Sequence, residues 1–194
     1  MTHYTGLLGD FDYDENTWVV TNDPEYKETL AFNRSYQNGP VYLPQGVKCL
    51  ARAFFNCDIP EGVYLAGKWD LRSVEQLDGM FYGANIPKDF FKECGGFETE
   101  GVKYMSKMFA KATIADIRCM NPITFVIGES TDVHDFAKDA SLFVDDEETS
   151  EVKYFKGFIC KYDFAKVLDI PEASLKQCTC WSEFEDLVSR FIGQ

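Results

Sequence analysis

Three aspartates near the N-terminus have the residue type and spacing of a cation site. Asp10, Asp12 and Asp14 alternate in the stretch DFDYDEN. An EF-hand loop, however, needs Gly at its sixth position and Glu at its twelfth, where this chain has Glu15 and Thr21. We therefore interpret the three carboxylates as the solvent-facing side of a strand. That placement makes them candidates for contact with a partner rather than calcium ligands.

A second acidic stretch, VDDEETSE, separates two apolar segments in the C-terminal half of the chain. The whole chain has 32 acidic and 19 basic residues and a formal net charge of −13. A surface of that sign repels phosphates, so we expect no direct binding of nucleic acid. We expect instead a protein partner that has a basic surface. The candidate contact residues in this stretch are Asp145, Asp146, Glu147 and Glu148.

Cysteine and histidine chemistry has few candidates. The chain has seven Cys, an odd number at a density far below that of a disulfide scaffold, so we expect free thiols. A zinc site would have to combine Cys178 and Cys180 with Cys160 or His134, without the C-x-x-C spacing usual for zinc. With only His3 besides His134, a Ser-His-Asp or Cys-His centre lacks candidates. We predict a protein that is not an enzyme and has no cofactor or bound metal.

The elements that must position these residues follow from a phrase that occurs three times. The copies begin at Val47 (VKCLARAFFNCDIP), Val74 (VEQLDGMFYGANIP) and Val102 (VKYMSKMFAKATI), in steps of 27 and 28 residues (74 − 47 and 102 − 74). A fixed period of this length indicates stacked repeats. Apolar residues recur at offsets 0, 3, 6, 7 and 12 from each Val. Offsets 0, 3 and 7 lie on one face of a short helix.

Each copy also has an extended partner segment. The tripeptide VYL occurs at 41–43 and again at 63–65. One unit of strand, turn and helix cannot bury its own apolar face, whereas stacked units bury a continuous core. We therefore expect Phe81 and Phe109, which both occupy offset 7, to be equivalent core positions.

The second and third copies resemble BspA-like leucine-rich repeats, a family with a "W(D)…V…M…MF" phrase. The stretches are WDLRSVEQLDGMFYGA at 69–84 and FETEGVKYMSKMFAKA at 97–112. The first copy departs from the phrase, with Ala53 and Phe54 in place of Met-Phe. The resemblance covers about residues 41–120 and implies a leucine-rich-repeat-like solenoid used for protein contacts. The matching residues are Trp69, Asp70, Val74, Leu77, Met80, Phe81, Val102, Met105, Met108 and Phe109.

The predicted fold class is therefore a mixed α/β repeat. It is a short leucine-rich-repeat-like solenoid of strand-turn-helix units, with a β-hairpin cap before it and a helical cap after it. We expect one cooperative domain with caps at 1–40 and 146–194 and the repeat array at 41–145. The hairpin is expected to turn at the acidic stretch DFDYDEN, and the last helix to begin at Ser182. The units lie near 41–62, 63–89, 90–116 and, in degenerate form, 117–145.

Two functions of different class fit these observations. The first is a non-catalytic protein-protein interaction module that uses the repeat surface. Tyr42 and Tyr64, the middle residues of the two VYL copies, would then lie in register as an exposed aromatic pair, a common kind of contact site. If the N-terminal hairpin covers them, they belong to the core instead. The alternative function is an acidic inhibitor of the phage anti-defence (anti-CRISPR-like) kind, which mimics nucleic acid and blocks a basic channel.

The expected location is cytoplasmic, with no membrane contact. The first 20 residues have no basic region followed by an apolar stretch, which a signal peptide requires. No apolar run approaches the ~20 residues that cross a bilayer.

Overall fold

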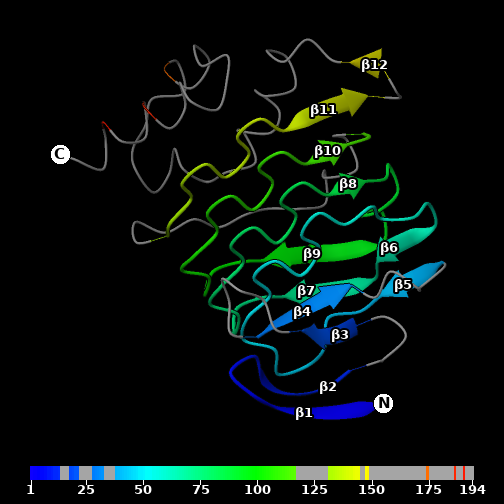
Figure 1. Ribbon diagram of the computed structural model, residues 1–194, viewed down its shortest axis with the longest axis vertical. Coiled ribbons are helices and arrows are strands. Elements are labelled where there is room, and N and C mark those ends of the chain that lie inside the picture. Colours follow the sequence, from blue (N-terminus) through cyan, green and yellow to red (C-terminus); the bar gives the residue numbers. More distant parts are fainter. Residues whose placement is uncertain are drawn as a thin grey trace.

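The computed structural model describes residues 1–13, 18–21, 28–32, 38–116, 131–144 and 147–148, and the single residues 174, 186 and 190. Between residues 1 and 148, every described element is a short strand or a turn. Figure 1 shows these elements stacked along the long axis, with β1 and β2 at one end and β11 and β12 at the other.

Two antiparallel hairpins form the N-terminal end of the stack. β1 (Thr2–Gly6) pairs with β2 (Gly9–Tyr13), and β3 (Trp18–Thr21) pairs with β4 (Thr29–Phe32). Burial alternates along β2, with its apolar residue inward and its aspartates exposed. One side of β2 therefore faces the interior and the other faces solvent, as in a half-buried strand.

The first hairpin turns at a different place from the one that the sequence predicted. Its strands pair from Thr2 opposite Tyr13 to Gly6 opposite Gly9, so the chain reverses at the two residues between Gly6 and Gly9. The acidic stretch consequently lies on β2 and beyond it rather than in the turn. The prediction was wrong because apolar and polar residues alternate in the same way whether the chain turns at the acidic stretch or between Gly6 and Gly9. The period-2 pattern therefore does not decide where the chain reverses.

The repeated phrase forms a series of tight turns instead of a helix. In the first copy, Arg52 and Asn56 have φ of 60° and 48°. The N–H groups of Ala53, Phe55 and Cys57 donate to the carbonyl three residues back, over 3.1 to 3.2 Å. Positive φ recurs at the matching positions of the later copies, which are Gly79, Gly83, Lys107, Lys111, Asp135 and Asp139.

Backbone hydrogen bonds between successive copies hold these turns in a stack. The N–H groups of Leu50, Arg52, Phe54 and Asn56 donate to carbonyls of the second copy over 2.7 to 3.0 Å. The second copy donates in the same way to the third, and the third to residues 132–138. An α-helix would use these N–H groups internally, at the carbonyl four residues back. Alternate N–H groups here bind the neighbouring copy instead.

The expected fold class, an α/β solenoid of strand-turn-helix units with a helical cap, is therefore wrong. The observed units consist of turns and short strands. The prediction failed because the offsets 0, 3 and 7 turn inward in these tight turns as they would on one helix face. The proposed cap at 146–194 lies outside the described residues, apart from Glu147, Glu148 and three isolated residues.

Short parallel strands complete each copy. β5 (Gly39–Val41) pairs with β6 (Val63–Leu65), and β7 (Gly67–Asp70) pairs with β9 (Cys94–Glu98). At offsets 11 and 12 the copies form a further sheet, in which only the last pair is antiparallel. Its strands are β8 (Asn85–Ile86), β10 (Thr113–Ile114), β11 (Ser141–Val144) and β12 (Glu147–Glu148).

A column of stacked phenylalanine rings lies at the centre of the stack. The ring centroids of Phe54 and Phe81 are 5.0 Å apart, and those of Phe81 and Phe109 are 5.1 Å apart, nearly parallel in both cases. Phe136 continues the column at 5.4 Å from Phe109. All four side chains are fully buried, so the expected equivalence of Phe81 and Phe109 is confirmed.

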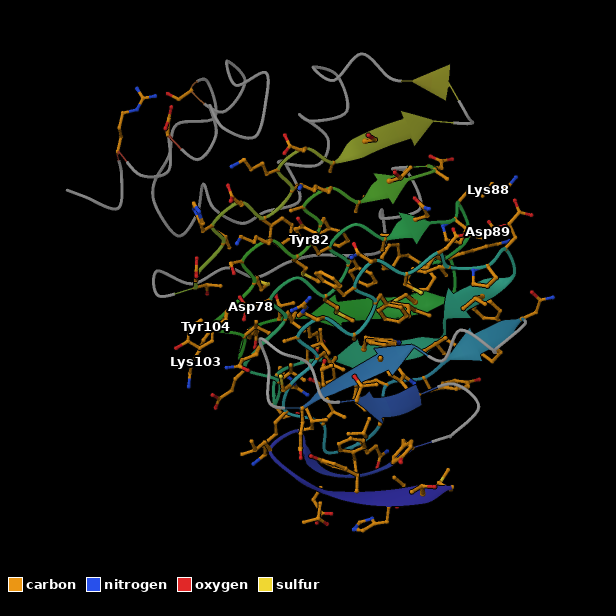
Figure 2. The ribbon with its side chains drawn as sticks, viewed as in Figure 1. Asp78, Tyr82, Lys88, Asp89, Lys103 and Tyr104 are labelled. Carbon is orange, nitrogen blue, oxygen red and sulfur yellow. The ribbon has the colours of Figure 1, made fainter. Side chains whose placement is uncertain are left out.

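Polar side chains lie on the outside of this column. Figure 2 shows Asp78, Lys103 and Tyr104 on one side of the stack, and Lys88 and Asp89 on the opposite side.

Truncating the central ring should destabilise the whole stack. Phe81→Ala should lower the free energy of unfolding by about 3–5 kcal/mol, because the ring contacts both neighbours in the column and leaves a cavity. Phe55→Ala is the matched control. Phe55 is half-buried and stacks on Tyr82 outside the core, at 5.1 Å. Its loss should cost less than about 2 kcal/mol. Urea melts that give equal costs for both variants would contradict the assigned column.

Candidate functional site

A cleft of about 810 Å³ lies at the N-terminal end of the stack. Its walls come from three parts of the chain: the first hairpin, the start of β3 and residues 40–46. Much of the lining is aromatic or proline. These residues are Phe11, Tyr13, Trp18, Pro40, Tyr42 and Pro44.

Two glycines in close contact set the hairpin against one wall of this cleft. Gly9 and Gly46 have φ of 124° and 89°, in the region that favours glycine. A Cβ on Gly9 would overlap the carbonyl oxygen of Gly46, and a Cβ on Gly46 would overlap that of Asp10. Beside them the Lys48 N–H donates to the Leu8 carbonyl over 2.7 Å. This close approach of backbone to backbone brings the carboxylates of β2 to the rim of the cleft.

The carboxylates of Asp10 and Asp12 flank one histidine at that rim. On β1, His3 places Nε2 at 2.9 Å from Asp10 Oδ1 and Nδ1 at 2.9 Å from Asp12 Oδ1. All three side chains are exposed. The hydrogen bond to Asp12 is the main cause that raises the pKa of His3 above 6.5, and both carboxylates add to it. His3 was not among the residues predicted for this site, although cross-strand pairing of β1 with β2 was the signal that could have placed it there.

The two tyrosines predicted as partner contacts are not in register. Tyr64 on β6 lies opposite Pro40, so Tyr42 is two residues beyond the position that we expected. Tyr42 is 62% exposed and lines the cleft with Asp10 and Asp12. Tyr64 is half-buried and does not line it. The alternative that the hairpin buries Tyr42 in the core is therefore wrong.

The other predicted contact residues cannot be placed at this cleft. Asp14, Asp145 and Asp146 lie outside the described residues. Glu147 and Glu148 are the two residues of β12, which lies at the far end of the stack from β1 and β2. The structure thus brings together Tyr42, Asp10 and Asp12 from the predicted set.

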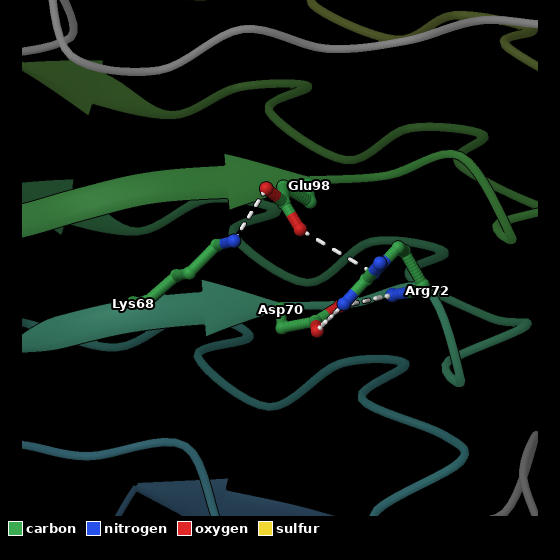
Figure 3. A network of polar contacts seen from close by, with 4 residues as sticks. All are labelled: Lys68, Asp70, Arg72 and Glu98. Carbon is green, nitrogen blue, oxygen red and sulfur yellow. Dashed lines mark hydrogen bonds and ion pairs between the residues drawn. The ribbon is translucent and has the colours of Figure 1, made fainter.

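A second recess, of about 640 Å³, shares residues 43–46 with the cleft and is more polar. Figure 3 shows its ion pairs. Arg72 binds both carboxylate oxygens of Asp70, and its Nε is 3.4 Å from Glu98. Lys68 Nζ is 2.7 Å from Glu98. The hydrogen bonds from Arg72 hold the pKa of Asp70 well below its usual range. Because both cations already have carboxylate partners, we assign this network to the joining of β7 and β9.

Metal and thiol chemistry find little support in the described ranges. Within them, no group of three or more His, Cys, Asp or Glu side chains could hold a metal ion. Cys178, Cys180 and Cys160 lie outside those ranges, and His134 is an exposed residue beside Asp135. Cys49, Cys57 and Cys94 are not joined by disulfide bonds, and burial raises the pKa of Cys49. No helix in the described part is long and apolar enough to cross a membrane.

The glycine contact generates a test of how the cleft is built. Gly46→Ala should cost about 1–3 kcal/mol more than Gly67→Ala, because its Cβ overlaps backbone. Gly67 also has a positive φ, of 73°, yet its added Cβ would meet only the ring of Tyr42, at 3.9 Å. Denaturant melts give the costs, and amide exchange at Lys48 reports whether the hairpin has detached. Equal costs with an unchanged Lys48 exchange rate would refute this role for the glycine pair.

The histidine should titrate above its ordinary range. We expect an NMR titration of His3 to give a midpoint above 6.5, with Asp12→Asn lowering it more than Asp10→Asn. A pKa raised by folding stabilises the protein fully below the unfolded value, and this contribution is lost as pH rises through the folded value. His3→Gln should therefore remove the decrease in the free energy of unfolding that occurs as pH rises above 6.5. A midpoint at or below 6.5 would show that the two ion pairs do not form.

Comparison with known proteins adds a family and little else. Comparison with the curated proteins and with the solved structures gives no match to this chain. One family model matches residues 48–159, which is more than half of the chain. The matched segment begins after Tyr42 and after the first hairpin, so all the lining residues named for the cleft precede it. By this match the chain belongs to the family described as "Mycoplasma protein of unknown function, DUF285".

Proposed function

We propose that this chain is a non-catalytic protein-binding module and that the N-terminal cleft is its contact site. The observation that carries the proposal is the position of Tyr42, an exposed aromatic residue in a concave site that also has carboxylates on its rim. Aromatic residues are enriched among the residues that dominate binding energy at protein interfaces. The resemblance of the repeated phrase to BspA-like repeats, which are used for protein contacts, supports the same function.

The distribution of charge bears on the alternative function. Residues 38–116 contain nine Lys and Arg and ten Asp and Glu, a net charge of −1. The remaining −12 of the formal −13 therefore belongs to residues before and after this segment. A nucleic-acid mimic needs closely spaced negative charges, and this part of the stack does not have such an excess. The acidic inhibitor of anti-CRISPR-like kind, like the cytoplasmic location, stays a prediction.

A photoreactive residue in the cleft tests the proposal. Benzoylphenylalanine in place of Tyr42 should crosslink, in a lysate of the native cells, to a discrete protein. The matched control is the same replacement at Tyr104, which is 45% exposed but does not line the cleft. The crosslink at position 42 should persist at high salt if aromatic contact dominates.

Two outcomes would contradict this expectation. The same crosslinked products at both positions, or none at position 42, would remove the cleft as the contact site. The unmodified chain could instead capture a protein whose binding weakens steeply with salt and does not depend on the residue at position 42. That outcome would favour the acidic inhibitor.

A further inference from the structure

We propose that the cleft binds an extended, proline-containing peptide segment that carries a basic residue. This inference rests on the proposed function, because it names the kind of partner that the same cleft accepts. Three features of the lining support it: the aromatic and proline walls, a buried donor without an acceptor, and the acidic rim.

The walls have the chemistry of a groove for polyproline II peptides. Tyr42, which is exposed, and Tyr13 of β2, which is half-buried, line the cleft together with Phe11 of β2 and Trp18 of β3, which are each only 2% exposed. The rings of Phe11 and Tyr13 are adjacent, with centroids 6.2 Å apart. Grooves lined by aromatic residues bind proline-rich segments because the polyproline II helix is already formed in the free peptide. Little conformational entropy is then lost on binding.

The indole of Trp18 favours an extended chain over a bound helix. Trp18 is only 2% exposed, and its Nε1 has no hydrogen-bond partner. Buried N–H groups are nearly always hydrogen-bonded, so an unpaired one is unusual. We infer that the bound partner supplies the missing acceptor. A polyproline II chain has free backbone carbonyls, whereas an α-helix has used its own. Because the N–H is covered in this structure, a peptide carbonyl reaches it only after a lining side chain shifts.

The rim determines the charge of the segment. Asp10 and Asp12 are exposed beside the aromatic walls. Among the described residues, both carboxylates form their ion pairs with His3, which is neutral above its pKa and then donates through one ring nitrogen. A Lys or Arg side chain can form charge-assisted hydrogen bonds with the same carboxylates. The net charge of −13 attracts a basic segment from a distance.

An unbiased peptide selection tests the inference. A phage-displayed library of random peptides, selected on the full chain, should enrich sequences that contain both proline and Lys or Arg. Selection on Tyr42→Ser should lose this enrichment, and selection on Tyr104→Ser should keep it. Since both tyrosines are exposed, thermal melts should show both variants folded. Enrichment of sequences without proline, enrichment that survives Tyr42→Ser, or no enrichment on the wild type would overturn the inference.

The selected peptide then tests each contact. Changing its basic residue to Glu should weaken binding about tenfold or more, as measured by fluorescence anisotropy. The double variant Asp10→Asn with Asp12→Asn should remove most of that difference. The indole N–H resonance of Trp18 should move downfield when peptide binds, as a new hydrogen bond requires. An unmoved indole resonance, or equal affinity for the Glu peptide, would contradict the assigned contacts.

The two proposals fail in different ways. A crosslink from position 42 to a protein, combined with a negative peptide selection, would leave the binding module standing and refute the extended segment. No crosslink and no selected peptide would refute both.

Discussion

The structure depends on a division of the backbone N–H groups within each repeated phrase. Alternate N–H groups close tight turns inside a copy, and those between them donate to the next copy. A single copy therefore leaves about half of its turn donors without a partner, and only a neighbour can supply the acceptors. Because buried backbone groups need partners, the copies stabilise one another and not themselves. The phenylalanine column forms as a consequence, since the same spacing brings equivalent rings to about 5 Å.

This arrangement requires backbone conformations that most residues avoid. Two positions in every copy have positive φ, and Arg52, Lys107 and Asp135 occupy the first of them. Such a conformation in a residue other than glycine costs on the order of 1–3 kcal/mol. The hydrogen bonds between copies offset this cost, because the strained residues lie among the donors. Arg52 and Lys107, for example, each donate to the following copy over 2.8 to 2.9 Å.

The first copy has no earlier copy beside it, and the end of the stack is where the chain differs most from its repeats. The first hairpin occupies this position through the contact of Gly9 with Gly46 and the bond from Lys48 to Leu8. A hairpin is not a copy of the phrase, and the cleft lies where this different element meets the stack, with β2 and residues 40–46 among its walls. The proposed binding site is thus a product of how the stack is closed at its N-terminal end.

The amino-acid sequence by itself determined the repeat, its period and the residues that face inward. Phe81 and Phe109 were identifiable as equivalent because burial of one side of a chain depends only on the spacing of apolar residues. It also determined that Asp10 and Asp12 face solvent, since alternation in a strand is a local pattern. The form of the unit was not determined, because a helix and a series of tight turns bury the same offsets. Only the tertiary structure decided between them, through hydrogen bonds to residues 26 or 27 positions away. It likewise decided that Tyr42 joins Asp10, Asp12 and His3 in one cleft, because the pairing of strands far apart in sequence sets which side chains meet.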